Sequence, residues 1–248
     1  MKNFLILFLF TITLASYGQE ADTILEEVES IMYPDNYWAR MTMVTIRPGK
    51  DDYSMTMEVY YKENAGSFIE ITEPSRSSGI RFLQKEETLW MFNPRSNSRR
   101  AVRLSPRESF QGSTFSNNDV GDPEYSDDYD TSLLETTIIV NHPELGDVEC
   151  YVLVCTASHR EAAYDRIDIY CATDDYRPVR FEYFTKSGML YRVMEFSGFK
   201  FIAGLVRPTV MVMEAMDQQG TFSKAVIEDM EIRDDLADSM FTQSALTR

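Results

Sequence analysis

Methionine pairs recur at a spacing of two residues within segments rich in β-branched and aromatic residues. Residues two apart in a strand point to one face of a sheet, so each pair shares a face. Flexible thioethers suit a surface that accommodates varied apolar shapes, although they also fill ordinary cores. A pocket for acyl chains is therefore one interpretation, and a plain core is the other. The candidate lining residues are Met41, Met43, Met55, Met57, Met211 and Met213, with Trp90, Phe92, Phe181 and Tyr183 from other strand-like segments.

A stretch between two β-rich regions, residues 105–132, lacks strand periodicity. Pro106 fits the first turn of a helix, and Ser116 is a candidate cap for a second short helix. Phe110 and Phe115 in this stretch need apolar cover. The stretch is interpreted either as a helical plug that fills one end of a barrel or as a mobile lid over a ligand pocket. The glycine between the two phenylalanines is a candidate hinge.

Five arginines gather within a short stretch of an otherwise acidic chain. Guanidinium groups recognise phosphate and carboxylate groups through paired, charge-assisted hydrogen bonds. The cluster is therefore a candidate contact for lipid phosphates or for an acidic partner, and local neutralisation by nearby carboxylates is the alternative. Its members are Arg95, Arg99, Arg100, Arg103 and Arg107.

The motifs of common enzyme and nucleotide sites are absent from the sequence. There is no Gly-x-Ser-x-Gly elbow, no phosphate loop, no Gly-x-Gly-x-x-Gly and no His-Glu-x-x-His. His142 and His159 stand in loop-like sequence, which favours solvated side chains. The acidic segment 119–130 lacks the glycine and terminal glutamate of a calcium loop, which favours a solvated loop. The sequence thus predicts no catalytic residue, no metal and no cofactor, and we do not expect an enzyme.

Charge and the N-terminal segment indicate where the protein works. The chain has 248 residues, and 24 Lys and Arg face 40 Asp and Glu for a formal net charge of −16. This acidic surface argues against nucleic acid as a partner. Residues 1–18 combine a positive start, an apolar run of about a dozen residues and a small-residue end, which is typical of a cleaved secretory signal. We expect the mature part, residues 19–248, to be a single exported domain.

The hydrophobic periodicity predicts one helix followed by many strands. Apolar residues at helical spacing predict a helix over residues 22–32, which Pro34 ends. Beyond it the period is two, and short turns join neighbouring segments, which predicts antiparallel hairpins. About eleven strands in one domain favour a mainly β (α+β) sheet curled toward a barrel, or a two-sheet sandwich. The expected strands are residues 37–46, 53–62, 67–72, 88–92, 134–140, 148–156, 166–172, 178–185, 190–201, 205–213 and 222–232.

Three cysteines are available in an exported chain, where disulfides are permitted. Cys150 and Cys155 are an odd number of residues apart in one predicted strand, so they are expected to face opposite sides. If that strand pairs with residues 166–172, Cys171 falls near Cys150, and a disulfide there is one hypothesis. Three buried thiols are the alternative.

Two sequence runs resemble the LolA-like outer-membrane lipoprotein-sorting family. They are residues 89–94 (LWMFNP), followed by two arginines, and residues 109–120 (SFQGSTFSNNDV). The resemblance is closest to the branch associated with permeases and transporters. Trp38, residues 69–74 and residues 238–241 extend it over most of the mature chain. Gln111 and Thr114 stand where Met and Asp are more usual in the family.

The resemblance implies an unclosed antiparallel β-barrel of about eleven strands covered by short helices, with an apolar cavity. It implies a monomeric periplasmic carrier that receives acyl chains of lipoproteins or related lipids from an inner-membrane permease and passes them toward an outer-membrane acceptor. An acylated cysteine near the cleavage region is missing, which favours a soluble carrier over a LolB-like receptor. A non-enzymatic accessory or sensor subunit of an inner-membrane permease is the alternative, and an exported hydrolase is a third hypothesis.

Overall fold

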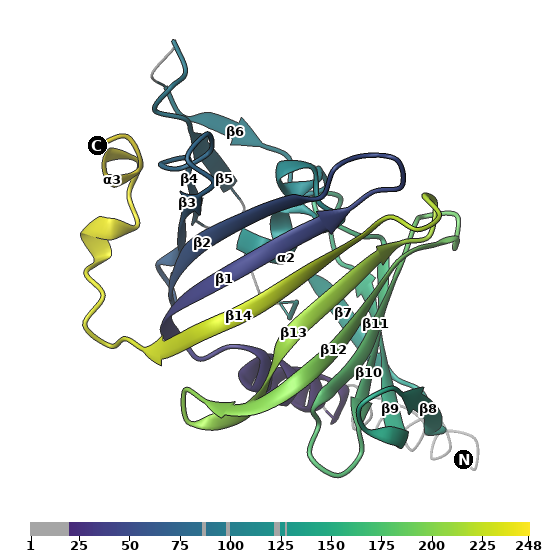
Figure 1. Cartoon of the computed structure of the whole chain (residues 1–248). Coiled ribbons are helices and arrows are strands. Elements are labelled where there is room, and N and C mark those ends of the chain that lie inside the picture. The colour runs from purple at the N-terminus through teal and green to yellow at the C-terminus, as the bar shows by residue number, and fades with distance from the viewer. Residues whose placement is uncertain (1–19, 86–87, 98–99, 122–124, 127) are drawn as a thin grey trace, which may run out of the picture.

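The computed structural model describes residues 20–85, 88–97, 100–121, 125–126 and 128–248. The predicted signal peptide and Arg99 lie outside the described residues. Within them, fourteen strands form one antiparallel sheet (Figure 1). No helix in the described part of the chain is long and apolar enough to cross a membrane.

The sheet consists of two runs of neighbouring hairpins that meet where the first and last strands pair. The first run is β1 (Asn36–Ile46), β2 (Tyr53–Lys62), β3 (Gly66–Glu73), β4 (Arg81–Lys85), β5 (Thr88–Phe92) and β6 (Val102–Leu104). The second is β7 (Tyr129–Leu133), β8 (Ile138–His142), β9 (Gly146–Ala157), β10 (Arg166–Ala172), β11 (Pro178–Phe184), β12 (Leu190–Ile202), β13 (Leu205–Ala215) and β14 (Phe222–Ile232). The order across the sheet is β6-β5-β4-β3-β2-β1-β14-β13-β12-β11-β10-β9-β7, and β8 also pairs with β9.

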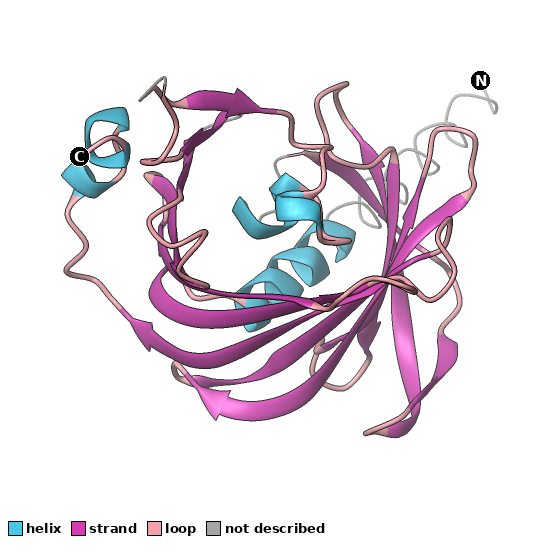
Figure 2. Ribbon diagram, turned by 45° about the horizontal axis from the view of Figure 1, so that its top comes forward, coloured by secondary structure: helices cyan, strands magenta, loops and turns pink. Residues whose placement is uncertain are grey.

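The sheet curls without closing, because its end strands β6 and β7 do not pair with each other. This unclosed antiparallel barrel confirms the predicted fold class (Figure 2). The expected count of eleven strands missed β4, β6 and β7. β6 has only three residues and β7 has the polar sequence Tyr-Asp-Thr-Ser-Leu, so neither has a recognisable apolar period. β4 has two adjacent apolar residues between polar ones, which is equally ambiguous.

The helix over residues 20–32 lies inside the curve of the sheet (Figure 2). It confirms the helix expected over residues 22–32, and its buried face is the predicted one, with Ile24, Leu25, Val28 and Met32 at most 4% exposed. These side chains join the main core cluster with the inward residues of the strands. An amphipathic helix of this length gains most of its stability from such packing.

Two short helical elements follow β6 inside the same curve, η1 (Phe110–Gly112) and α2 (Asn117–Gly121). Ser116 caps α2 as predicted, since its Oγ accepts a hydrogen bond from the Asp119 N–H at 3.2 Å. The helix expected to begin at Pro106 does not form. A turn replaces it, closed by the Glu108 N–H donating to the Ser105 carbonyl at 3.2 Å.

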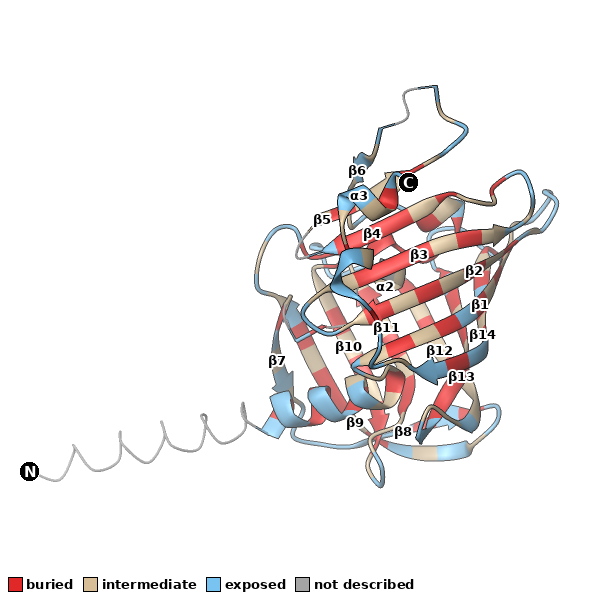
Figure 3. Cartoon of the chain, turned by 90° about the vertical axis from the view of Figure 1, so that its left-hand side faces the viewer, coloured by how far each residue is buried: buried red, intermediate tan, exposed pale blue. Residues whose placement is uncertain are grey.

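Burial alternates along the strands and separates two faces of the sheet (Figure 3). The inner face belongs to the main core cluster. On the outer face, the C-terminal segment with η2 (Asp238–Met240) and α3 (Gln243–Leu246) builds a second cluster around Leu236, Phe241 and Leu246.

The cysteines are free and buried, so the hypothesis of a Cys150–Cys171 disulfide is wrong. β9 and β10 pair as expected, but the register sets Cys150 opposite Ala172 and Cys171 opposite Tyr151. The two thiols therefore point to opposite faces of the sheet. The predicted opposition of Cys150 and Cys155 is confirmed, because they belong to different core clusters.

Candidate functional site

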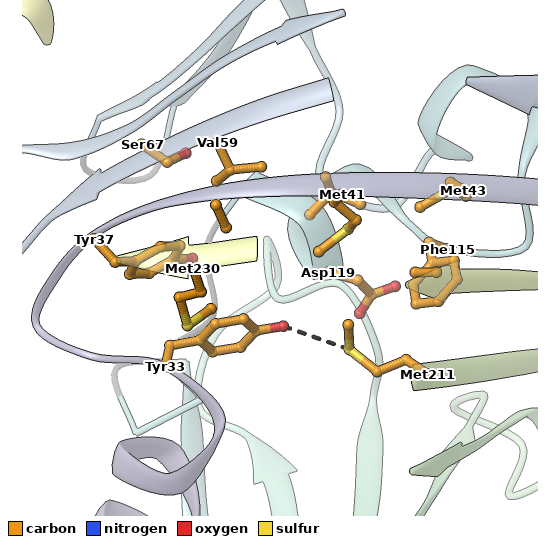
Figure 4. A pocket seen from close by; sticks show the side chains of 13 residues that line it. Tyr33, Tyr37, Met41, Met43, Val59, Ser67, Phe115, Asp119, Met211 and Met230 are labelled. Atoms are coloured by element: carbon orange, nitrogen blue, oxygen red, sulfur yellow. Dashed lines mark hydrogen bonds between the residues drawn. The ribbon is translucent and has the colours of Figure 1, made fainter. Parts of the chain in front are cut away.

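An interior cavity lies between the concave sheet, the end of the first helix and the segment that follows β6. We call it the inner cavity (Figure 4). Its free volume is about 20 Å³, which is room for about one water molecule. Thioether, aromatic and aliphatic groups dominate its wall. The lining residues are Tyr33, Tyr37, Ala39, Met41, Met43, Val59, Ser67, Phe115, Asp119, Val120, Met211, Ala225 and Met230.

The six predicted methionines all lie on the inner face, in the main core cluster. Met41, Met43 and Met211 line the inner cavity, and Met230 of β14 joins them. The other three predicted methionines pack beside the cavity and are at most 1% exposed: Met55, Met57 and Met213. The strand alternation placed these side chains correctly because their polar neighbours in sequence occupy the outer face.

Residues 105–121, which we call the cover segment, lie across the interior between the two sheet edges. Phe110 packs against Phe82 with ring centroids 4.9 Å apart, and Phe115 faces the cavity. Both phenylalanines are nearly fully buried. Between them Gln111 (φ 49°) and Gly112 (φ 77°) take left-handed backbone conformations, which glycine adopts without strain.

The cover segment is held to the sheet by a few polar contacts. The Thr114 N–H donates to the Ser223 hydroxyl at 2.9 Å, and the Thr114 hydroxyl donates to the Met213 carbonyl at 2.7 Å. Buried Arg192 donates to the Thr114 carbonyl at 3.3 Å. Gln111 reaches Met91 Sδ at 3.8 Å. Gln111 and Thr114 are the two positions where the sequence departs from the pattern it resembles.

Asp119 is the carboxylate in the wall of the inner cavity. The sequence analysis included it in the acidic segment 119–130, for which a solvated loop was expected, and that expectation is wrong for Asp119. Its Oδ2 accepts hydrogen bonds from the Ser116 N–H at 2.6 Å and from the Tyr164 hydroxyl at 2.7 Å. In return, the Asp119 N–H donates to the Ser116 hydroxyl, so the two residues cap the start of α2 reciprocally. Burial raises the pKa of Asp119, against the opposing effect of these hydrogen bonds. The Ser-x-x-Asp spacing of Ser116 and Asp119 is the feature of the sequence that could have predicted this cap.

A tyrosine cluster continues the interior beyond Asp119. Tyr164 and Tyr183 have ring centroids 4.4 Å apart, and the Tyr125 and Tyr183 hydroxyls are 3.4 Å apart. Phe181 packs edge-on against Tyr125 at 5.8 Å. The predicted residues Phe181 and Tyr183 are therefore interior, although neither lines the cavity itself. Burial raises the pKa of the Tyr183 hydroxyl, which keeps it neutral.

Trp90 and Phe92 do not reach this interior. In β5 the alternation turns Leu89 and Met91 inward, so Trp90 and Phe92 point to the outer face. There they pack in the second cluster, beneath the C-terminal segment. These two side chains therefore pack against the C-terminal segment of the same chain.

The predicted arginine cluster is dispersed. Arg95 donates to three backbone carbonyls, those of Ser75, Arg76 and Ser78, and so fastens the turn between β3 and β4. Arg103 within β6 and Arg100 just before that strand are exposed. Arg107 lies elsewhere, 3.5 Å from Asp165.

His142 is buried, so the expectation of a solvated loop residue is wrong. Its Nδ1 accepts hydrogen bonds from the Glu144 and Leu145 N–H groups at 3.2 and 3.1 Å. Nε2 therefore carries the proton and donates to the Phe196 carbonyl at 2.7 Å. Among the residues that the structure describes, no group of three or more His, Cys, Asp and Glu side chains is placed to hold a metal ion.

An unclosed antiparallel barrel that surrounds a helix and a small apolar cavity defines the LolA-like class of folds. The first solved structure that matches, a LolA superfamily protein from Nitrosomonas europaea, is 29% identical and covers 91% of this chain and 99% of its own, with a TM-score of 0.81. A domain from Vibrio parahaemolyticus described as an outer membrane lipoprotein-sorting protein covers 93% and 100% at 18% identity and a TM-score of 0.78. A DUF1329 family protein from Desulfovibrio piger covers 93% and 99% at 21% identity and a TM-score of 0.77.

A family model described as "Uncharacterized protein" matches residues 63–248. No curated protein sequence matches the chain. The chain belongs to the LolA-like superfamily, as its sequence runs indicated.

Proposed function

We propose that the protein is a non-enzymatic periplasmic carrier for acyl chains of lipoproteins or related lipids, which it passes toward the outer membrane. In this proposal residues 1–18 are a cleaved signal and residues 19–248 are the carrier domain. The inner cavity, with its thioether and aromatic wall behind a separate cover segment, is the observation that carries the proposal. Similarity to a LolA superfamily protein and to a lipoprotein-sorting domain supports it.

The small free volume means that a ligand must displace protein groups. Burying a chain of about twelve methylenes offers a gross gain of ~10 kcal/mol at ~0.8 kcal/mol each. That gain opposes the contacts of the cover segment, chiefly Phe115 in the cavity wall and the hydrogen bonds of Thr114. Thioether side chains reorient at low cost, so the lining adapts to the incoming chain. Uptake and release then need a conformational step and no covalent chemistry.

One observation favours a second candidate function. A cavity of about 20 Å³ is also what a filled core contains. A protein with such a core would serve as an accessory or sensor subunit of an inner-membrane permease, recognising a protein rather than a lipid.

The experiment fastens the cover segment and measures lipid uptake. The Ser223 hydroxyl lies 2.9 Å from the Thr114 backbone nitrogen, so the double variant Thr114→Cys/Ser223→Cys places two thiols on neighbouring residues, and mass spectrometry after oxidation verifies that a disulfide joins them. Native mass spectrometry after incubation with a monoacyl lipid should show binding by the reduced variant and no binding by the oxidised one. The two single variants are the controls, since their uptake should be indifferent to oxidant.

Two results contradict the proposal. Equal uptake by the oxidised and reduced double variants would show that the cover segment is not the gate. If the unmodified mature protein carries no lipid and takes up none, the accessory-subunit function is favoured instead.

A further inference from the structure

A cationic groove opens on the outer side of the cover segment, on a chain whose formal net charge is −16. It consists of two adjacent spaces of about 540 and 210 Å³, which share Arg107, Asp165, Phe184 and Thr185 in their walls. We call them together the outer groove. Its walls carry one carboxylate and five permanent cations: Arg107, Arg160, Arg166, Lys186 and Arg192.

Some of these cations already form ion pairs with carboxylates, and others do not. Arg166 is paired with Asp168 at 3.0 Å, and Arg192 with Asp217 at 2.6 Å. By contrast, neither Arg160 nor Lys186 has an ion-pair partner within 4.0 Å in the part of the chain that is described, and both are exposed.

The remaining basic groups of the groove, Arg107 and His159, lie beside carboxylates. Arg107 has a long pair with Asp165, 3.5 Å, and donates to the Arg160 carbonyl at 3.0 Å. His159 also lines the groove, with its Nε2 2.8 Å from Asp128 and its Nδ1 3.7 Å from Glu161, so Arg160 and Lys186 are the cations left for a ligand.

The groove and the inner cavity are separated by a single layer of side chains. Phe115 lines both spaces. Beside it Ser116 and Tyr164 line the groove and bond to Asp119, which lines the cavity. An outward movement of the cover segment would therefore join an apolar cavity to a cationic groove.

We propose that the outer groove binds the phosphate of an anionic amphiphile whose acyl chain enters the inner cavity past Phe115. Guanidinium and ammonium groups are the usual protein ligands of phosphate, and an apolar space one side chain away suits the attached chain. This inference rests on the proposed carrier function and adds the class of headgroup that the carrier selects.

The test compares two monoacyl lipids with the same chain, lysophosphatidic acid and its uncharged monoacylglycerol counterpart, by titration calorimetry at low salt. The intact protein should bind the phosphate lipid about tenfold more tightly than the neutral one. In Arg160→Glu/Lys186→Glu this preference should fall to about onefold, while the affinity for the neutral lipid stays unchanged. The matched control Arg100→Glu/Arg103→Glu changes net charge equally on the exposed β6 hairpin and should keep the preference.

Inorganic phosphate serves as the competitor that separates a free anion from a lipid headgroup. It should weaken binding of the phosphate lipid only at concentrations far above that lipid's dissociation constant, because it gains nothing from the cavity. Equal affinity of the intact protein for the two lipids would overturn the headgroup proposal and leave the carrier function standing. A preference abolished by the control variant would place the phosphate site at β6 instead. Binding of neither lipid would contradict the carrier function itself.

Discussion

Met41 and Met57 face each other across β1 and β2, yet only Met41 borders the inner cavity. Substituting each by alanine therefore tests where the cavity lies. Met→Ala in a core costs about 2–5 kcal/mol, with ~24 cal/mol for each Å³ of void that remains. Met57 is 0% exposed, so an enclosed void of roughly 60 Å³ there adds about 1.5 kcal/mol, for a total near 4 kcal/mol. At Met41 the void opens into existing space, and we expect about 2.5 kcal/mol.

Urea unfolding measures the two losses, provided that both variants keep the parent slope. The expected difference of about 1.5 kcal/mol corresponds to roughly 3–6 °C in Tm for a domain of this size. Binding of a monoacyl lipid gives the second readout. Met41→Ala should bind it at least as tightly as the parent, because the cavity is larger, and Met57→Ala should be unchanged. If Met41→Ala is the more destabilised variant, or if it alone loses lipid binding, the assignment of the cavity to this side of the strand pair is incorrect.

Four further outcomes are expected. Because burial raises the pKa of Asp119, the folded state holds its proton to higher pH than the unfolded state, so stability falls as pH rises above about 3.9; Asp119→Asn should flatten that fall in urea titrations at several pH values. Gly66→Ala places a Cβ 2.1 Å from the Gln84 carbonyl oxygen and should cost about 3 kcal/mol or more, whereas Gly188→Ala, with open space around it, should cost about 1 kcal/mol. Arg207→Met removes donors to the Ser30 and Ile31 carbonyls at the end of the first helix and to the Ala203 carbonyl, and should cost about 3 kcal/mol by urea unfolding. Burial raises the pKa of the three thiols to between about 11 and about 12, so a thiol reagent at pH 8 should count three thiols in denaturant and react slowly with the native protein; fewer than three would indicate a disulfide.

The features that sequence analysis predicted correctly are those with a clear period. The first helix shows apolar residues on one side and glutamates on the other, and that face is the buried one. In β1 and β2 the methionines alternate with Thr42, Thr56 and Glu58, which leaves one choice of inner face. Because Cys150 and Cys155 are an odd number of residues apart in one strand, the same alternation correctly placed them on opposite faces of the sheet.

Periodicity failed where both faces of a strand are covered. The run Leu89 to Phe92 is continuously apolar, because the C-terminal segment covers its outer face while the core covers its inner face. Alternation alone cannot assign Trp90 in such a run. The register that separates Cys171 from Cys150 likewise depends on strand pairing rather than on either strand's own pattern.

The outer groove and Asp119 depend on contacts between distant segments. Arg107 meets Asp165 and Arg160 across more than fifty residues, and Tyr164 reaches Asp119 across 45. In the sequence Arg107 belonged to a cluster whose other described members lie elsewhere in the fold. Only the topology, in which the end strands β6 and β7 do not pair with each other and the cover segment lies between them, brings these groups together.

The unclosed sheet edge also bears on the proposed carrier function, in which the cover segment is the part that moves. Segments β1 to β5 and β9 to β14 are each held on both sides by ladder hydrogen bonds, so displacing one breaks many bonds at once. The cover segment follows the edge strand β6 and is held by isolated contacts, chiefly those of Thr114 and Arg192. Moving it would expose buried side chains such as Phe110 but would break no pairing between strands of the barrel, and it is the same segment whose Phe115 separates the cavity from the groove. In a barrel closed by pairing β6 to β7, the proposed entry of an acyl chain past Phe115 would lack this route.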